Sequence, residues 1–351
     1  MRRRVTIEDI AHDSNTSITT VSMVLRDKPG IGAETRERVL QVARELGYER
    51  RIPAPGSQAP RTAAMILRTR VDHPGLQNPS VNPFYGNVIS GLEAAARTSR
   101  INLLYGTLPV DPANHPYELP DHLLGQQLDA VLLIGAFAEE TIETIAAGRS
   151  GPIVLVDGPT GQSPHDTVAS DNQGGTLLAV RHLVEHGHRR IAIIGTDLDA
   201  DPNLSQRRAG YLQALAEAGL EPLIVQTHRV RAHVVTDATV DLLAAHPDVT
   251  AIVGANDAAA IEAMRGAQRA GREVPTDLSV IGFDDIVLAS EIRPALTTMA
   301  VDRITMGRQA IRLLVDRLDT PGACRIMSVL QPTLTIREST GSAPQSAAIT
   351  D

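Results

Sequence analysis

Cysteine, aromatic residues and long apolar runs are scarce in this chain of 351 residues. Its one cysteine, Cys324, cannot form an intrachain disulfide or a CxxC metal site, which suits a reducing compartment. The longest wholly apolar run, residues 130–138, has about nine residues, whereas roughly 20 are needed to cross a bilayer. The basic start at Arg2, Arg3 and Arg4 is not followed by the apolar segment of a secretory signal. We therefore expect a cytoplasmic protein with no membrane span.

Sequence motifs of several enzyme classes are also missing. The chain has no GxGxxG, no GxxxxGK followed by Ser or Thr, no GxSxG and no HExxH. His186 and His188 in the string EHGHRR have neither a cysteine nor a suitably spaced third ligand beside them, so we expect no metal there. No nucleophile or acid and base pair stands out. We expect no cofactor and no enzymatic activity.

The charge of the chain is unevenly distributed along its length. A chain of this length fits two or three domains of about 150 residues. Although the net charge is -8, residues 1–61 contain ten Arg and one Lys against eight Asp or Glu, which is a net charge of +3. A small basic module can attract phosphates locally, whereas the acidic remainder resists non-specific association with nucleic acid.

The first 48 residues have the pattern of three short helices. Thr6 is placed to cap the first helix, with an acidic residue three positions later in the manner of a capping box. Asn15 lies in a three-residue break that needs a positive φ, and Ser17 is placed to cap the second helix. The third helix is expected at residues 33–46. The buried stripe of the second helix is expected to be Val21, Val24 and Leu25.

Helix, three-residue turn, helix and supporting helix is the helix-turn-helix arrangement, in which the second helix enters the major groove of DNA. The strings TIEDIAHDSNTSITTVSMVL and TRERVLQVARELGY resemble the DNA-binding headpiece of the LacI/GalR transcriptional regulators. For this segment alone, a three-helix bundle with no role in DNA binding is the alternative.

The resemblance implies DNA contacts from the second helix and its surroundings. The expected DNA-binding set is Thr6, Ser17, Ile18, Thr19, Thr20, Ser22 and Met23. Of these, Ile18, Thr19 and Met23 suit base edges, whereas Ser17, Thr20 and Ser22 suit phosphate oxygens. Packing within the headpiece is the alternative for Ile18 and Met23. Family members often have arginine where Met23 stands, so we expect an operator that differs from the common family sequence.

Residues 49–61 are dense in Pro, Gly and Ser and predict a linker. Pro53 and Pro55 each remove a backbone donor, so a regular helix is not expected. In the LacI/GalR family this place usually holds a hinge helix whose leucine wedges into the minor groove. Ser57 stands near that position here, and we therefore do not expect operator bending by a leucine wedge.

Beyond residue 62, short apolar runs alternate with helical segments, which predicts βαβ units and parallel sheets. The strand candidates are residues 63–67, 101–104, 130–134, 153–156, 191–194, 223–225, 251–253 and 280–282. The helix candidates are residues 88–97, 175–186, 206–218, 234–245 and 258–270. About eight such units exceed one doubly wound sheet, so we expect two lobes, with ligands bound between them at the carboxyl ends of the strands. Residues 340–351 predict a flexible tail.

The same stretch resembles the effector core of the LacI/GalR regulators. Matching strings include NPFYGNVISGLEAAA, HLVEHGHRRIAIIG, RRAGYLQALAEAGL and GREVPTDLSVIGFDD. The implied fold is an N-terminal all-α helix-turn-helix headpiece, residues 1–48, followed by an α/β core, residues 62–339. The core is expected to be periplasmic-binding-protein-like (type I), with two doubly wound parallel-sheet lobes, and to carry the dimerisation surface.

The resemblance also implies a set of effector contacts, namely Phe84, Tyr85, Asp157, Arg207, Asn256 and Asp284. Arg207 stands where the family has an effector-binding arginine, whose fork suits vicinal hydroxyls or a carboxylate. Asn256 and Asp284 follow strand ends, where ligands bind in this architecture. The alternatives are a surface salt bridge for Arg207, a helix cap for Asn256, a turn for Asp284, and core packing for the aromatic pair. Val230 stands where many sugar-responsive members have an aromatic residue.

Together these features predict a ligand-controlled repressor. Its expected partners are double-stranded, pseudo-palindromic operator DNA, a small hydroxylated effector such as a sugar, and a second copy of the chain in a homodimer. The alternatives are a solute-binding receptor or an α/β enzyme on the same architecture. A receptor has no use for a headpiece and needs an export signal, and an enzyme needs reactive residues that the chain does not show.

Overall fold

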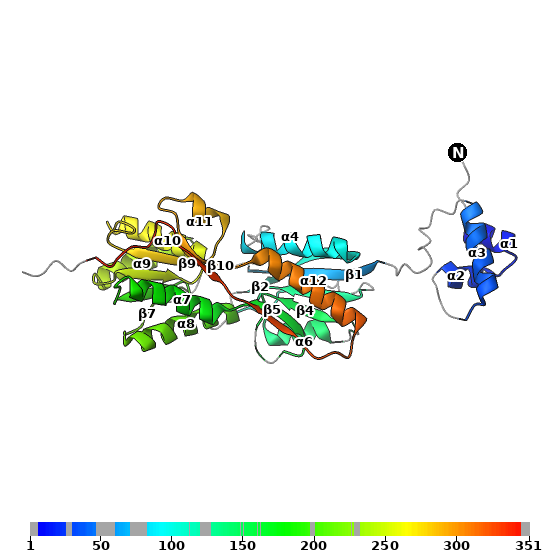
Figure 1. Ribbon diagram of the computed structural model, residues 1–351, viewed down its shortest axis with the longest axis horizontal. Helices are drawn as coiled ribbons and strands as arrows, with labels where there is room; N and C mark the ends of the chain where they lie inside the picture. The colour runs from blue at the N-terminus through cyan, green and yellow to red at the C-terminus, as the bar shows by residue number, and fades with distance from the viewer. Residues whose placement is uncertain are drawn as a thin grey trace, which may run out of the picture. The chain divides into compact units, whose positions relative to one another are not determined.

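The computed structural model divides the chain into two compact units, Met1–Pro60 and Arg61–Asp351 (Figure 1). It describes residues 6–25, 30–46, 60–70, 83–111, 113–119, 128–147, 149, 151–159, 161, 163–196, 201–225, 227 and 232–344. The expected linker, apart from its last two residues, and its Pro53, Pro55 and Ser57 lie outside the described residues. Val230 and residues 345–351 also lie outside them.

The first unit is a small three-helix domain. Its helices are α1 (Ile7–Asp13), α2 (Ile18–Leu25) and α3 (Ala33–Glu45). Thr6 and Asp9 form the predicted capping box, in which each side chain accepts from the backbone N–H of the other residue. One side of every helix contributes to a common core of Ile10, Ala11, Val21, Val24, Val39 and Ala43. The three predicted helices are thereby confirmed.

The turn between α1 and α2 is held by polar contacts. Asn15 has a φ of 51°, the left-handed conformation that the sequence predicts at this position. Ser14 Oγ donates to the carbonyl of Ile10 at 2.6 Å, and Arg38 Nε of α3 donates to the carbonyl of Ser14 at 3.2 Å. Because α3 bonds to this turn, it fixes the angle at which α2 leaves α1.

The second unit consists of two lobes, each built on a six-stranded sheet. In lobe 1 the strand order is β11-β5-β4-β3-β1-β2, and in lobe 2 it is β12-β10-β9-β8-β6-β7. All strand pairs are parallel except β10 with β12, which is antiparallel. The two doubly wound parallel-sheet lobes predicted from the sequence are confirmed.

Lobe 1 contains β1 (Arg61–Arg70), α4 (Pro83–Thr98), β2 (Ile101–Val110), β3 (Ala130–Ile134), α6 (Glu139–Ala146), β4 (Ile153–Val156), β5 (Asp166–Ser170), α12 (Arg303–Asp319) and β11 (Met327–Leu330). Lobe 2 contains α7 (Asn172–Glu185), β6 (Ile191–Ile194), α8 (Pro202–Ala218), β7 (Leu223–Val225), α9 (Ala232–Ala245), β8 (Ala251–Gly254), α10 (Asp257–Arg269), β9 (Ser279–Asp284), α11 (Val287–Glu291), β10 (Thr297–Ala300) and β12 (Thr333–Thr335). All predicted strands of the core lie within these elements, and so do the predicted helices, except that those at residues 175–186 and 258–270 include the C-cap residue of α7 and of α10.

The chain passes between the lobes after β5, after β10 and after β11. Two of these passages end at capped helices. Asp171 Oδ1 accepts from the N–H of Gly174 at the start of α7, and Asp302 Oδ1 accepts from the N–H of Thr305 at the start of α12. The strands and helices that the sequence did not predict, β5, β10, β11, β12 and α12 among them, belong largely to these passages.

Helix α12 returns to lobe 1 and packs along α4, as Figure 1 shows. Gly91 of α4 and Gly307 of α12 lie against the backbone of the opposite helix, where a Cβ atom at either position would collide with it. These two glycines therefore set the close approach that fixes α12 on the lobe.

The folded part of the second unit begins earlier and ends later than the sequence predicts. Arg61, expected as the last linker residue, begins β1 and pairs with Asp319 at 2.6 Å. Past Ser339, where the flexible tail was expected to begin, Gly341 donates to Ser279 Oγ at 3.0 Å and Ala343 to the carbonyl of His186 at 2.8 Å. The segment docked on lobe 2 therefore extends to at least Ala343.

Candidate functional site

The outward face of α2 is the first candidate site. Ser17 and Thr19 are exposed, and Ile18 is 53% exposed although its side chain is large and apolar. Thr20, Ser22 and Met23 are half-buried. Of the predicted stripe, Val21 and Val24 are buried, and Leu25 is half-buried against the same core. Ser17 Oγ accepts from the N–H of Thr20 at 3.0 Å, so Ser17 caps α2 as predicted.

Ile18 does not pack into the core of the small unit, which was the alternative for this residue. An exposed isoleucine beside exposed hydroxyl groups gives α2 a mixed apolar and polar surface, the kind that can meet both a thymine methyl group and base edges. Thr6 is also exposed, and its hydroxyl is bonded to Asp9 at 2.9 Å.

The second candidate site lies between the lobes of the larger unit. We use the term interlobe cluster for Arg68, Tyr85, Asp157, Asp201, Arg207 and Asp284. These residues come from the carboxyl-terminal half of β1, the start of α4, the residue after β4, the residue that caps α8, the N-terminal half of α8 and the last residue of β9. Carboxyl ends of parallel strands form one edge of a sheet, and here the edges of both sheets contribute.

Arg207 is the most highly bonded residue of the interlobe cluster. Its Nε donates to Asn172 Oδ1 at 2.8 Å, Nη1 to the carbonyl of Ala255 at 2.8 Å, and Nη2 to Asp284 Oδ1 at 3.0 Å. The guanidinium also lies 3.8 Å from the centroid of the Phe283 ring. It is therefore buried and oriented, unlike the surface salt bridge that was its alternative. Three of its five N–H groups are used in these bonds.

Asp284 and Asp157 are carboxylates buried between the lobes. Burial raises the pKa of Asp284, and the ion pair with Arg207 opposes this rise. Burial also raises the pKa of Asp157, to about 7, against the lowering influence of Arg207 and of the Tyr85 hydroxyl. Both residues have a positive φ, 117° at Asp284 and 55° at Asp157. At each of them the backbone turns away from the direction of the preceding strand.

Tyr85 and Phe84 have different surroundings. The Tyr85 hydroxyl donates to Asp157 Oδ2 at 2.9 Å, and burial raises the pKa of this phenol well above its usual value. Phe84 is buried in the main core and meets the Tyr85 ring edge-on at 5.1 Å between centroids. The structure therefore joins Tyr85 to the cluster, whereas Phe84 supports it from the core.

Asn256 lies after β8 and caps α10. Its Oδ1 accepts from the N–H of Ala259 at 2.9 Å, the helix cap that was its alternative. The residue is half-buried, and the adjacent Ala255 carbonyl accepts from Arg207. Asn256 therefore follows a residue that bonds to the interlobe cluster, and its own Oδ1 is used in capping α10.

Sequence reasoning missed Arg68 and Asp201, which pair with each other between the lobes. Arg68 Nη2 lies 2.7 Å from Asp201 Oδ2, and Arg68 Nη1 donates to Asn114 Oδ1 at 2.8 Å. Asn203 Nδ2 of α8 donates to the backbone carbonyl of Asp157 at 3.2 Å. The position of Arg68 near the end of a predicted strand was the one signal that could have pointed to it.

Buried oxygens without a hydrogen-bond partner occur at the carboxyl ends of strands in both lobes. Within the described residues these include Asp157 Oδ1 and the hydroxyls of Thr69, Ser170, Thr196 and Thr227. Buried polar groups in proteins are nearly always bonded to protein, water or ligand. Their placement at these strand ends suits a ligand that supplies several hydroxyl groups.

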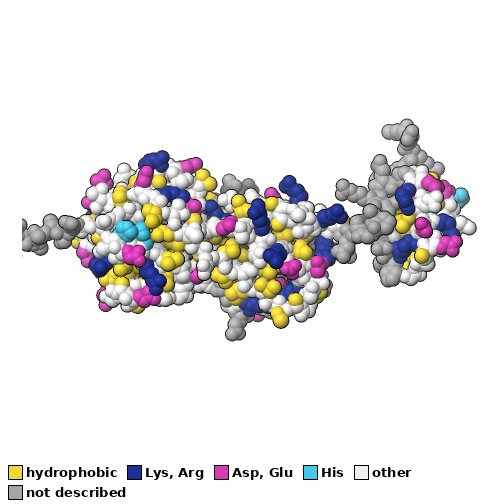
Figure 2. All heavy atoms as spheres, in the orientation of Figure 1, with side chains coloured by type: hydrophobic (Ala, Val, Ile, Leu, Met, Phe, Trp, Pro, Cys, Tyr) yellow, Lys and Arg dark blue, Asp and Glu magenta, His cyan; other side chains and the backbone are white. Residues whose placement is uncertain are grey.

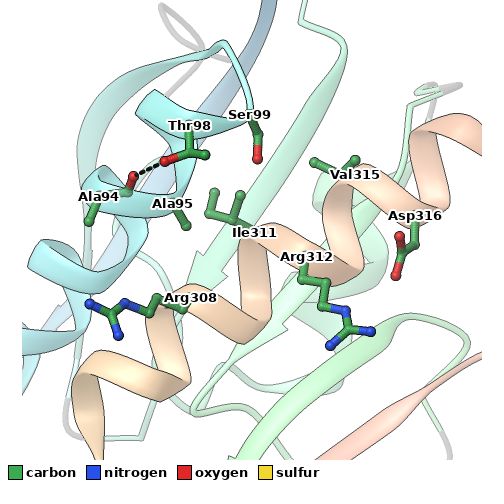
Figure 3. Close-up of a pocket in the computed structure, with 9 residues that line it drawn as sticks. All are labelled: Ala94, Ala95, Thr98, Ser99, Arg308, Ile311, Arg312, Val315 and Asp316. Atoms are coloured by element: carbon green, nitrogen blue, oxygen red, sulfur yellow. Dashed lines mark hydrogen bonds between the residues drawn. The ribbon is translucent and has the colours of Figure 1, made fainter.

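A separate groove of about 450 Å³ lies on lobe 1 between α4 and α12 (Figure 3). Its lining includes Ala95, Thr98, Arg308, Ile311 and Arg312, and none of the expected effector contacts belongs to it. It is therefore distinct from the interlobe cluster.

Figure 2 shows histidine at the surface of lobe 2. Within this lobe, His182 bonds to Thr340 and His188 to the carbonyl of Gly341, so both hold the docked C-terminal segment. The rings of His182 and His186 lie 4.2 Å apart, and His188 is buried between Thr250 and the carbonyl of Gly341. Among the described residues, no group of three or more His, Cys, Asp or Glu side chains could hold a metal ion. No helix within the described ranges is both long and apolar enough to cross a bilayer.

Comparison with known proteins separates the two units in the same way. Residues 6–51 match the family described as "Bacterial regulatory proteins, lacI family", and residues 180–340 match a periplasmic binding protein-like domain. The HTH-type transcriptional regulator CelR of Thermobifida fusca is 31% identical over 96% of this chain and 99% of its own length. The chain belongs to the lacI family of bacterial regulatory proteins.

Other relatives in this lacI family extend the comparison. The ribose operon repressor of Haemophilus influenzae is 30% identical over 95% of this chain and 98% of its own length. A solved structure of the transcriptional regulator CelR with cellobiose has 28% identity and a TM-score of 0.68, and the match covers 96% of this chain and all of that one. The present chain is a ligand-responsive, DNA-binding transcriptional regulator of the same family.

Proposed function

We propose that this lacI-family regulator is a homodimeric repressor that binds a pseudo-palindromic operator through α2 and a small sugar through the interlobe cluster. It acts in the cytoplasm, where operator DNA lies. The relatives, one of them solved with cellobiose and another named for the ribose operon, support a sugar as the effector class.

In the DNA-binding part of the proposal, Ile18, Thr19 and Met23 contact base edges. Ser17, Thr20, Ser22 and Thr6 contact phosphate oxygens and set the position of α2 in the groove. Met23 offers an apolar contact where an arginine would read guanine, so we expect a thymine at the base pair that it faces.

This DNA-binding part can be tested by selecting operators from random duplexes with the full-length chain. We expect the selected site to be pseudo-palindromic, and Thr19→Ala and Met23→Arg should change the preferred base at the same position of each half-site. A matched control is Glu37→Gln, an exposed position on α3. Selection of the same bases by all variants would contradict the assignment of α2.

In the effector part of the proposal, Arg207 is the main sugar-binding residue. Its guanidinium is buried, stacked on Phe283 and aligned by three hydrogen bonds, so the unused N–H groups have a fixed direction. The Oδ1 of Asp157, which has no partner among the described residues, and the carboxylate of Asp284 can both bond to sugar hydroxyls. In this proposal Phe84 supports the Tyr85 ring, which it meets edge-on, and Asn256 donates to the sugar with its amide nitrogen while its Oδ1 caps α10.

Calorimetric titration of sugars, beginning with cellobiose and ribose, tests the effector site. Losing one buried hydrogen bond to the ligand should weaken binding by roughly 5-fold to 100-fold in Arg207→Lys and Asp284→Asn. Arg269→Gln changes an exposed arginine of lobe 2 and is the control. Equal affinity in wild type and both site variants would remove these residues from the site.

The regulatory step follows from the construction of the second unit. An effector bound between the lobes contacts both of them, so it favours one lobe arrangement over another by the difference of its affinities. In a dimer the lobe arrangement sets the spacing of two headpieces, and thereby operator affinity.

A further inference from the structure

Two side-chain contacts at the interlobe cluster, one between two of its members and one from the neighbouring Asn203, join the lobes. Arg68 on β1 belongs to lobe 1 and Asp201 before α8 belongs to lobe 2, with 2.7 Å between Nη2 and Oδ2. Asn203 of α8 also reaches the backbone carbonyl of Asp157 in lobe 1 at 3.2 Å. Any separation of the lobes at this point breaks both contacts.

Each member of the Arg68–Asp201 pair is anchored within its own lobe. Arg68 Nη1 donates to Asn114 Oδ1 at 2.8 Å, and Asn114 Nδ2 donates to the carbonyl of Ala136 at 3.0 Å. Asp201 Oδ1 accepts from the N–H of Asn203 at 3.0 Å and so caps α8. Two side chains that are already oriented lose little conformational entropy when they pair.

Burial makes this pair different from a surface salt bridge. The Arg68 and Asp201 side chains are 9% and 12% exposed, so salt and water screen their attraction weakly. If the lobes separate without a replacement partner, two partly desolvated charges are left unpaired, which is strongly unfavourable. Asp201 also interacts electrostatically with the carboxyl groups of Asp157 and Asp284. A positive charge beside Asp201, such as that of Arg68, offsets the repulsion among these groups.

A ligand entering here must provide partners for both charges. A neutral sugar can accept from Arg68 with one hydroxyl oxygen and donate to Asp201 with a neighbouring hydroxyl. A ligand carboxylate can replace Asp201 on Arg68, but it leaves Asp201 unpaired and adds a negative charge to a cluster that already holds the carboxyl groups of Asp157, Asp201 and Asp284. The charges of the cluster therefore favour an uncharged ligand over its acid counterpart.

We propose that Arg68 and Asp201 are effector-selecting residues that bind each other across the lobes until an effector separates them. In the effector-free protein they act as a latch between the lobes. In the complex they favour neutral sugars over sugar acids. The selection rests on the proposed function, because it places the effector at the interlobe cluster, whereas the latch can be measured without effector or operator.

The latch is tested on the full-length chain by pulsed electron paramagnetic resonance. One spin label is attached to the exposed Cys324, between α12 and β11, and the other to Glu221→Cys, an exposed position between α8 and β7 of lobe 2. In this background, Asp201→Asn removes the charge but keeps a residue that caps helices well. Arg68→Lys keeps the charge but is too short to reach both present partners.

Without effector, the wild type should show one narrow distance distribution. Asp201→Asn should increase the population of a second, open distance by roughly tenfold or more, and Arg68→Lys by less. Arg269→Gln breaks an exposed ion pair of the same lobe and should leave the distribution unchanged. Unchanged distributions in both latch variants, or the same change in the control, would overturn the latch.

The selection is tested by calorimetry with matched pairs of sugars, namely glucose with glucuronate and galactose with galacturonate. The wild type should bind the neutral member at least tenfold more tightly, and Asp201→Asn should reduce this ratio. Equal or tighter binding of the acid by wild type, or an unchanged ratio in Asp201→Asn, would overturn the selection. If no sugar of any kind binds, the proposed effector class fails, and the spin-label distances still decide the latch.

Discussion

Asp157 should make the stability of the larger unit depend on pH. Its carboxyl group is buried between the lobes, and Oδ2 accepts a hydrogen bond from the Tyr85 hydroxyl. The other oxygen, Oδ1, has no hydrogen-bond partner among the described residues. Burial raises the pKa of Asp157 from 3.8 to about 7. Arg207, Asp201 and Asp284 face it and shift this pKa in opposing directions.

The sign of the pH effect follows from proton binding in the two states. Between pH 4 and 7 the folded protein keeps the Asp157 proton, whereas the unfolded chain has released it. Unfolding therefore releases a proton, so stability falls as pH rises, by about 1.4 kcal/mol for each pH unit. The full difference, about 4 kcal/mol, is reached near pH 7, and stability then stays level.

Asp157→Asn removes the ionisation but keeps the shape of the side chain. We expect the variant to match or fall slightly below wild type at pH 5 and to exceed it by about 2–3 kcal/mol at pH 8. Urea unfolding of the full-length chain, followed by far-UV circular dichroism between pH 5 and 8.5, measures the difference. Asp257 is also buried and has its pKa raised to about 7, but it is present in both proteins, so its contribution cancels in the difference between their free energies of unfolding. A difference between variant and wild type that is constant with pH would refute the reasoning.

Two further predictions concern helix caps. Ser17→Ala should destabilise the small unit by about 1 kcal/mol, because it removes the acceptor for the N–H of Thr20, and thermal unfolding of the unit should show a lower midpoint. Asn256→Asp keeps an acceptor for the N–H of Ala259, so it should preserve stability. It removes the amide N–H₂ group and should therefore weaken sugar binding by roughly 5-fold or more. Unchanged sugar affinity would show that Asn256 caps α10 and does not bind the sugar.

Local patterns along the chain were sufficient to predict most of the elements. Thr6 and Ser17 cap helices where the sequence places caps, and Asn15 takes the positive φ expected of it, because these depend on neighbours within a few residues. Most of the predicted core strands are apolar runs buried on both faces, such as β3 and β4. Strands β5 and β10 were missed because their residues, DTVAS and TTMA, carry polar side chains at buried positions.

The interlobe cluster was predicted only in part. Arg207 and Asp284 were expected in one site and do form an ion pair, because α8 and the end of β9 meet at the same sheet edge. Arg68 and Asp201 are 133 residues apart and belong to different lobes, so their contact depends on how the lobes meet. That arrangement is set by three chain passages and by the α4–α12 packing, none of which has a local signature.

The most direct test of the account is calorimetric titration of the best-binding sugar into wild-type protein with and without the selected operator, paired with operator titration with and without the sugar. The account predicts that sugar changes operator affinity and that operator changes sugar affinity by the same factor, because coupling between two sites is reciprocal. In Arg207→Lys, sugar affinity should fall while sugar-free operator affinity stays unchanged. Sugar and operator that bind wild type independently of one another would contradict an effector switch at the interlobe cluster.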